Sequence, residues 1–461
     1  ARQGIVVYDP DDVKGISVEE GDAKIKKSAK GMQGLDITPL FDTIIKHTQP
    51  YPDRNAEPLQ LQISALGYDD YIGRLGIGRI TKGVIKAGST VAVAKGDGQI
   101  EQKKINQVFV YRGLKRMAVD QAEAGDIVVI SGIADISIGE TICDPADPQP
   151  LEMIHIEEPT LSMYFMVNKS PFAGKSGKFV TSRHIRERLN KELEVNVGLK
   201  VEETDSTDSF KVSGRGELHL SILIENMRRE GYELAVSKPE VIMRRGDHNQ
   251  VQEPIEEVVL SVPDEYSGSV ISKLNVRKGM MQEMHSENGF THLEYLVPTR
   301  GLLGYRSEFI NDTRGEGTMV RRFAKFDDYV GEIPQRTNGV AIAQEEGVAT
   351  PYAIFNISER VQMFIEPGTK VYEGMIIGMN ARSDDMVVNP CKAKKATNMR
   401  AAGSDDNIKL APARTFTLEE ALEFIDDDEL VEIVPDDIRL RKKYLKELER
   451  RRSGRKIKQE D

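Results

Sequence analysis

Short apolar or alternating segments, separated by glycine-containing turns, fill the chain from about Glu57 to Pro150. The segments LQLQISAL, STVAVAKGDG, KINQVFVYRG and DIVVISGI each have the length of one strand, and turns recur about every eight to twelve residues. Many short strands at this spacing predict a closed β-barrel or a sandwich. Before them, residues 1–34 show no sustained pattern, whereas residues 36–48 have the apolar spacing of a short amphipathic helix that ends before Pro50.

Two later segments repeat one order of elements. The first opens at Glu158 and Pro159 with the strand-like TLSMYFMV, and its helix patterns are VTSRHIRERLNKELE and GELHLSILIENMRREG. The second opens at Glu253 and Pro254 with EVVLSV, has helix patterns in GSVISKLNVRKG and from near Gly304, and closes with TMVRRFAKF. Each has the order β-α-β-β-α-β of the ferredoxin-like, split-βαβ fold, whose open sheet face is often used to contact nucleic acid or protein.

The remainder of the chain, from about Glu332, is predicted to begin β-rich, with strands in GVAIAQ, ATPYAIFNI and VQMFIEPGTKVYEGMIIGM. It ends in an acidic helix (LEEALEFID), a short strand near LVEIVP and a basic helix. The expected fold class is multidomain α+β. The predicted limits are 1–52 for a linker and helix, 53–152 for the barrel, 153–246 and 247–331 for the two ferredoxin-like domains, and 332–461 for the C-terminal domain.

Composition agrees with a folded, multidomain protein. A length of 461 residues corresponds to about three to four domains, so we expect several separate cores. The content of 39% apolar and 30% charged residues excludes wholesale disorder and a collagen-like chain. No window approaches the roughly 18 consecutive apolar residues of a membrane span. Cys143 and Cys391 have neither zinc-site nor disulfide-framework spacing, so we expect no metal and a reducing, cytoplasmic environment.

The net charge of −11 is distributed unevenly, and two basic segments lie near the C-terminus. Residues 438–458 contain eleven Lys and Arg against two Glu, and residues 387–414 contain six against two Asp, which leaves −24 on the rest. Local basic clusters on an acidic protein suit a structured polyanion such as RNA, because the acidic remainder limits indiscriminate binding. The alternative for residues 438–458 is a solvated charged tail.

The segment 387–414 has no apolar period and is rich in side chains that bind phosphate or ribose. We predict a basic loop that enters RNA, and the alternative is a disordered, solvated loop. Its candidate residues are Lys392, Lys394, Lys395, Asn398, Arg400, Lys409 and Arg414.

A second candidate set lies in PTRGLLGYRSEFINDTRG, where glycines permit tight turns and guanidinium groups are suited to fork onto phosphates. The set consists of Arg300, Arg306 and Arg314. The alternative is intramolecular pairing with nearby acids, which are Glu308, Asp312 and Glu316. The neighbouring Arg321 and Arg322 present the same two alternatives.

No nucleotide-binding or catalytic motif is found in the sequence. GVIKAGST has Ser89 where a phosphate loop needs Lys, and FAGKSGKF at 172–179 lacks the required spacing. His219 lies at helix spacing among apolar residues, so we interpret it as structural, at a domain contact, rather than as an acid or base. We therefore expect no catalytic, cofactor-binding or metal-binding residue in this chain.

Several long strings resemble the TypA/BipA family of translational GTPases. They are SGRGELHLSILIENMRREGYELAVSKPEVI, PTRGLLGYRSEFI, GTKVYEGMIIG, TNMRAAG and LEEALEFIDDDELVEIVPDDIRLRKKYL, and the resemblance runs from about Ile37 to the terminus. It implies a GTPase domain, a translation-factor β-barrel (domain II), two ferredoxin-like domains similar to domains III and V of elongation factor G, and a family-specific C-terminal domain. This chain resembles the part after the GTPase domain, and residues 36–48 resemble the last helix of that domain.

The resemblance also implies partners, which are the ribosome, its RNA in both subunits, and the acceptor arm of a tRNA near the basic loop. It implies roles in stress- and cold-responsive translation and in large-subunit assembly. GTP and Mg²⁺ would be held by the missing N-terminal domain, so this chain alone is expected to be non-catalytic and monomeric. The alternative is a stand-alone RNA-binding ribosome-assembly protein without GTPase activity. A free-standing enzyme is disfavoured because no nucleophile, base and orienting group occur together.

Overall fold

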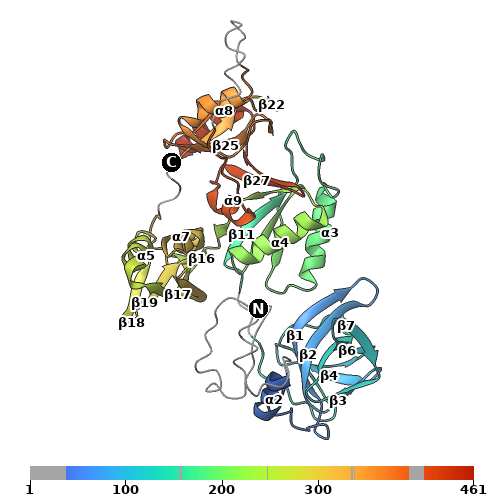
Figure 1. Cartoon of the computed structure of the whole chain (residues 1–461). Coiled ribbons are helices and arrows are strands. Elements are labelled where there is room, and N and C mark those ends of the chain that lie inside the picture. Colours follow the sequence, from blue (N-terminus) through green and yellow to red (C-terminus); the bar gives the residue numbers. More distant parts are fainter. Residues whose placement is uncertain are drawn as a thin grey trace, which may run out of the picture. The chain divides into compact units, whose positions relative to one another are not determined.

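The computed structural model describes residues 38–154, 158–246, 248–333, 336, 338–393 and 410–460, except for the side chains of residues 38–40 and 454–460. The chain divides into two compact units, residues 1–154 and 155–461. Figure 1 shows the elements of both units coloured along the sequence.

The first unit contains a short helix and a β-barrel. The helix, α2 (Thr38–His47), leaves Phe41, Ile44 and Ile45 exposed. The strands are β1 (Gln60–Asp69), β2 (Gly73–Lys82), β3 (Val84–Lys86), β4 (Thr90–Ala94), β5 (Ile100–Lys104), β6 (Val108–Arg112), β7 (Lys115–Val119), β8 (Gln121–Glu123), β9 (Ile127–Ser131) and β10 (Thr141–Cys143). They form a sheet in the order β5-β4-β10-β1-β2-β9-β6-β7 and a separate pair, β3-β8. Both contribute to one buried apolar cluster, as a barrel requires.

The second unit begins with a ferredoxin-like domain. Its elements are β11 (Leu161–Met166), α3 (Ser182–Leu193), β12 (Lys200–Glu203), β13 (Ser209–Gly214), α4 (Glu217–Glu230) and β14 (Leu234–Ser237), with antiparallel strand order β12-β13-β11-β14. Helix α3 begins after Thr181, whose side chain accepts a hydrogen bond from the His184 amide. Helix α4 ends at Gly231, whose φ of 95° is the left-handed conformation that favours glycine. The predicted β-α-β-β-α-β order is confirmed.

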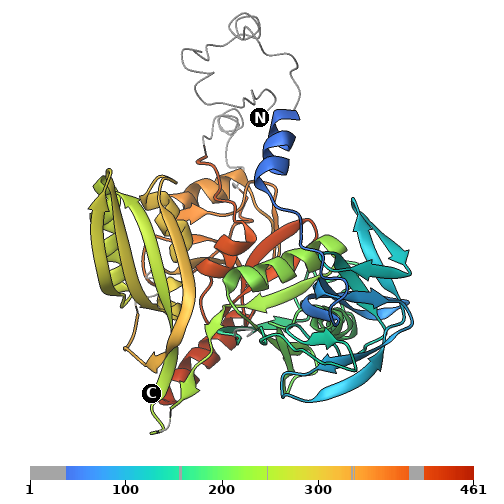
Figure 2. The ribbon, with the colours of Figure 1, turned by 90° about the horizontal axis from the view of Figure 1, so that it is seen from below.

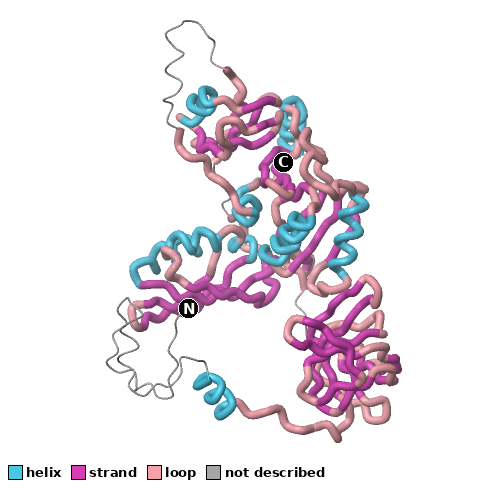
Figure 3. The backbone as a smooth tube through the Cα atoms, turned by 45° about the vertical axis from the view of Figure 1, so that its right-hand side comes forward, coloured by secondary structure: helices cyan, strands magenta, loops and turns pink. Residues whose placement is uncertain are grey.

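The second ferredoxin-like domain has the same topology. Its elements are β17 (Val251–Pro263), α5 (Asp264–Val276), β18 (Met280–Glu287), β19 (Phe290–Pro298), α6 (Thr299–Leu302), α7 (Tyr305–Asp312) and β20 (Thr318–Asp328). The strand order is β20-β17-β19-β18, the short β16 (Arg244–Arg245) extends the sheet at β17, and β15 (Glu240–Val241) pairs with β11. Leu274 of α5 and Phe309 of α7 pack on the buried face of the sheet, and the other face is left open (Figures 2 and 3).

The C-terminal domain is β-rich with terminal helices, as predicted. Its elements are β21 (Val340–Ala343), β22 (Gly347–Val348), α8 (Pro351–Ser358), β23 (Val361–Met363), β24 (Lys370–Val371), β25 (Met375–Asn380), β26 (Met386–Val388), α9 (Leu418–Phe424), β27 (Glu429–Val434), β28 (Asp437–Lys442) and α10 (Glu447–Glu460). Strand β28 occupies the start of the basic segment 438–458, and it buries Arg441 and Lys442. That part of the segment is therefore not a solvated tail.

The prediction of a strand in ATPYAIFNI is wrong, because residues of this segment form α8. The Thr350 side chain caps the helix by accepting a hydrogen bond from the Ala353 amide at 3.2 Å. Pro351 occupies the start of the helix, where its missing N–H removes no hydrogen bond. These two end signals outweigh the β-propensity of the aromatic and β-branched residues that follow.

One continuous sheet joins the first ferredoxin-like domain to the C-terminal domain. Strand β14 pairs with β27, with Leu234 opposite Ile433, and the order continues through β28, β25, β21 and β26. In Figure 1 the red β27 adjoins the green strands of the earlier domain. A single buried cluster contains Val236 of one domain and Val431 of the other. These two domains share a core, while the barrel, the second ferredoxin-like domain and the rest of the C-terminal domain have clusters of their own, in line with the expectation of several separate cores.

Candidate nucleic-acid interface

The segment 387–414 leaves the C-terminal domain from a well-anchored root. The Asn389 side chain accepts a hydrogen bond from the Cys391 amide at 2.9 Å and donates one to Glu345 at 2.8 Å. The Thr350 hydroxyl donates to the Lys392 carbonyl at 2.8 Å, and its amide donates to the Pro390 carbonyl at 2.9 Å. Lys392 is thus held by its backbone while its side chain is exposed.

The two ends of the segment pack against one apolar cluster of the C-terminal domain, which includes Ile354 and Tyr372. Leu410 and Cys391 both pack against it. Arg414 is fixed by a hydrogen bond from its amide to the Met363 carbonyl at 2.9 Å, and its guanidinium lies 4.6 Å from the Phe416 ring centroid. The remaining candidates lie outside the described residues, namely Lys394, Lys395, Asn398, Arg400 and Lys409.

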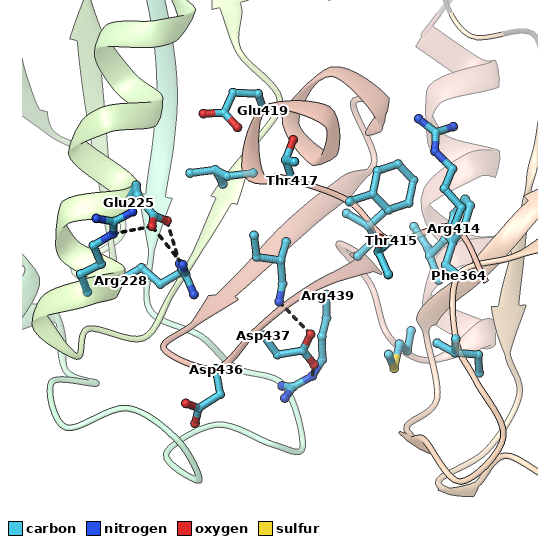
Figure 4. A pocket seen from close by; sticks show the side chains of 18 residues that line it. Glu225, Arg228, Phe364, Arg414, Thr415, Thr417, Glu419, Asp436, Asp437 and Arg439 are labelled. Carbon is cyan, nitrogen blue, oxygen red and sulfur yellow. Dashed lines mark hydrogen bonds and ion pairs between the residues drawn. The ribbon is translucent and has the colours of Figure 1, made fainter. Parts of the chain in front are cut away.

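Arg414 also lines a cavity of about 570 Å³, whose other walls come from α4, β25, the start of α9 and β28 (Figure 4). Its wall carries further arginines, which are Arg228, Arg229 and Arg439. Glu225 accepts hydrogen bonds from Arg228 and Arg229, each at 2.7 Å, and the first of these contacts holds its pKa down at about 2. Asp437 accepts from Arg439 at 2.9 Å. Because their charges are largely compensated inside the protein, these arginines are weak candidates for phosphate binding.

The three arginines of the second candidate set have different environments: Arg300 is paired inside the domain, whereas Arg306 and Arg314 are exposed. Arg300 is bound to the fully buried Glu253, with contacts of 2.5 and 3.0 Å, so its guanidinium is engaged inside the domain. Glu253 is none of the acids that the sequence suggested. Arg306 is exposed on α7, and Arg314 is exposed 5.6 Å from the Tyr266 ring centroid, with a positive φ of 52°. The structure does not bring these three arginines together into one site.

The neighbouring arginines on β20 are paired internally. Arg322 contacts Glu257 at 2.5 Å, and Arg321 lies 3.7 Å from Glu256 and 3.9 Å from Glu217. Burial raises the pKa of Glu217 to about 7.

His219 has a structural environment. Its Nε2 lies 2.7 Å from the Asn196 side chain, and its Nδ1 accepts from the Arg215 amide at 3.3 Å. Burial lowers its pKa. Both partners belong to the same ferredoxin-like domain, so these contacts hold α4 within that domain rather than joining two domains.

The glycine-rich loop in FAGKSGKF binds an internal carboxylate. The Gly174 and Gly177 amides donate to Glu233 at 2.9 and 3.2 Å. Asn168 then bridges Glu233 to Glu432 of β27, at 2.8 and 2.9 Å. Both carboxylates are fully buried, so this network ties the two domains together beneath their shared sheet. No sequence motif indicated it.

No described helix is long and apolar enough to cross a membrane. In the same residues, His, Cys, Asp and Glu side chains do not gather into a group able to hold a metal ion.

Comparisons with known proteins match three parts of the chain. Residues 73–143 match the sequence model of elongation factor Tu domain 2, residues 250–337 that of the elongation factor G C-terminus, and residues 338–447 that of the TypA/BipA C-terminal domain. The chain thus combines two domains found in translation elongation factors with a C-terminal domain of the TypA/BipA type.

Relatives that align over most of this chain identify the family more closely. The chain is 49% identical to the large ribosomal subunit assembly factor BipA of Salmonella typhimurium strain LT2, over 92% of this chain and 70% of that protein. It is 50% identical to the factor of the same name from Haemophilus influenzae, over 96% of this chain and 73% of that protein. The chain belongs to the TypA/BipA family. A solved chain from Thermus thermophilus gives a TM-score of only 0.43 at 16% identity, over 64% of this chain and 59% of that one.

Proposed function

We propose that this chain is the ribosome-binding portion of a TypA/BipA-type translational GTPase, acting in the cytoplasm in large-subunit assembly and in stress- and cold-responsive translation. The relatives named large ribosomal subunit assembly factor support the assembly role. Within the chain, segment 387–414 contacts ribosomal RNA and the acceptor arm of a tRNA.

The anchored root of this segment is the observation that carries the proposal. Lys392 is exposed on a backbone fixed by Thr350, and the sequence that follows adds four further Lys and Arg before Leu410. Fixed cations next to a basic segment lower the entropy cost of binding phosphates, and neutralised phosphates release counterions. Arg228 and Arg439, which line the cavity beside Arg414, are already paired with acids of this chain. The proposal therefore places the main contact with RNA on segment 387–414 and not in the cavity.

We further propose that GTP and Mg²⁺ are bound by a GTPase domain outside this sequence. The glycine-rich loop FAGKSGKF does not fit a phosphate, because the Gly174 and Gly177 amides already hold the Glu233 carboxylate. The exposed Phe41, Ile44 and Ile45 of α2 support packing of that helix on another domain.

The test is co-sedimentation of this chain with ribosomes across a salt series, without nucleotide. The variant replaces the cations of the segment, as Lys392→Ala, Lys394→Ala, Lys395→Ala and Arg400→Ala. Each lost phosphate contact should lower the slope of log affinity against log salt by about one, so the variant should bind more weakly and with a flatter slope. The matched control removes four exposed cations of the first ferredoxin-like domain, as Lys169→Ala, Lys178→Ala, Arg183→Ala and Lys200→Ala.

The proposal requires the two variants to differ. Equal binding of the segment variant and the wild-type chain at every salt concentration would show that segment 387–414 does not contact RNA. Equal losses in both variants would show only a general dependence on charge, and would contradict the assignment of the segment.

A further inference from the structure

Strand β18 forms an exposed edge of the second ferredoxin-like sheet. It pairs with β19 on one side, and no strand of the described chain pairs with its other side. All eight of its residues are exposed. Met280, Met281 and Met284 are 46%, 39% and 49% exposed, so three apolar side chains lie at the surface of one short strand. The strand therefore offers both backbone hydrogen-bonding groups and apolar contact area to a partner.

The charges along this edge are acidic. Glu283 lies directly opposite Glu294 across the β18–β19 pair, an arrangement of like charges that destabilises a sheet. Glu287 follows on the same strand face, two positions beyond His285, which stacks on His292 with ring centroids 4.8 Å apart. Within the described residues, none of the three glutamates forms an ion pair. A cation placed beside β18 would relieve the repulsion between Glu283 and Glu294.

We propose that the outer edge of β18 accepts an extended, basic polypeptide segment as an added strand. The backbone of the added segment forms hydrogen bonds with β18. Lys or Arg side chains at alternate positions of that segment contact Glu283 and Glu287, and its apolar side chains, on the other face, contact Met281 and Met284. Methionine side chains are flexible and adapt to different apolar partners. This surface is separate from segment 387–414 and does not depend on its contact with RNA.

The same charges disfavour the other occupants. Phosphates of RNA would be repelled by the three glutamates. A second copy of this chain, paired edge to edge through β18, would place the glutamates of both copies along one two-stranded junction, where like charges are unfavourable.

The test uses a short fluorescent peptide that alternates Lys and Val, measured by anisotropy against the whole chain. Two control peptides accompany it: one in which Glu replaces each Lys, and one methylated on the backbone nitrogens that would face β18. The variant Glu283→Lys with Glu287→Lys should lose about tenfold or more in affinity, because each cross-strand charge pair changes from attractive to repulsive. The matched control, Glu346→Lys with Glu359→Lys, changes the net charge equally at exposed sites of the C-terminal domain.

Each outcome decides the proposal. Binding of the Lys–Val peptide that is lost in Glu283→Lys with Glu287→Lys, retained in the matched control and abolished by backbone methylation supports strand addition at β18. Equal binding of the methylated peptide would contradict backbone pairing. Equal losses in both variants, or no binding of the Lys–Val peptide to the wild-type chain, would overturn the proposal. Thermal unfolding of each variant, followed by circular dichroism, verifies that it is folded.

Discussion

Replacement of Glu217 by Gln is predicted to stabilise the second unit at alkaline pH and to change it little at acid pH. Glu217 begins α4, its side chain is 15% exposed, and burial raises its pKa to about 7 even though Arg321 lies 3.9 Å away. The Gly304 amide donates a hydrogen bond to it, and the nearby Glu423 adds repulsion. Glutamine has the same shape and accepts the same hydrogen bond, but it carries no charge to be desolvated.

The sign follows from a folded-state pKa that is higher than that of the unfolded chain, where a glutamate titrates near 4.5. Between these values the folded protein binds more protons than the unfolded chain, so the free energy of unfolding falls as pH rises through this window. Above pH 7 the whole penalty applies. The difference between 4.5 and about 7, at about 1.4 kcal/mol per pKa unit, corresponds to about 3 kcal/mol.

The assay is urea unfolding followed by circular dichroism, because the sequence contains no tryptophan to report by fluorescence. Glu217→Gln should raise the free energy of unfolding by about 3 kcal/mol near pH 8, and by about 1 kcal/mol or less near pH 5. Glu346→Gln, at an exposed position, is the control and should give no pH-dependent gain. A gain for Glu217→Gln that is the same at both pH values would refute the reasoning, because it would show that the carboxyl is not protonated in the folded protein near pH 5.

Three further substitutions test the fold. Glu429→Gln should cost about 3–5 kcal/mol in urea unfolding, because the buried glutamate pairs with Arg336 and Lys442 at 2.8 and 3.0 Å; a loss below about 1 kcal/mol would contradict this. Thr417→Ala should cost about 1 kcal/mol and speed amide exchange at the start of α9, because it removes the side-chain hydrogen bond on which the capping box depends. Gly83→Ala should lower the melting temperature of the barrel far more than Gly88→Ala does. Both glycines have positive φ, but an added Cβ at Gly83 would lie 2.7 Å from a backbone atom, whereas an added Cβ at Gly88 would meet open space. Equal effects would exclude the close approach as the cause.

Elements with strong local signals could be predicted from the sequence. Helix α4 was identifiable because GELHLSILIENMRREG combines helical apolar spacing with a terminal glycine that the structure places in the left-handed conformation. Helix α8 has a Thr-Pro start, which is a helix signal, but the aromatic and β-branched residues that follow it favour a strand in the sequence. Strand β28 could not be predicted because its cations resemble a solvated tail. The burial of one of them, Lys442, is compensated by acids elsewhere in the chain, such as Glu429.

The candidate site was predictable only in part, for the same reason. The sequence located the positive charge, but an arginine that is available to phosphate and one that is already paired look alike in a sequence. Arg300 belongs to the second kind because Glu253, distant along the chain, is buried beside it. The network around Glu233 was likewise invisible, because its members come from separate segments.

By itself, the sequence determined the family, the order of most elements and the places where charge accumulates. Periodicity, helix-end signals and long matching strings are local properties, so they can be recognised without a structure. Only the tertiary structure decided that β14 pairs with β27, so that two domains share one sheet and one core. It also decided which charges are internally neutralised and that β18 is left as an exposed edge. Strand pairing and ion pairing join residues far apart in the chain, and their free energy depends on burial and register, which no local pattern encodes.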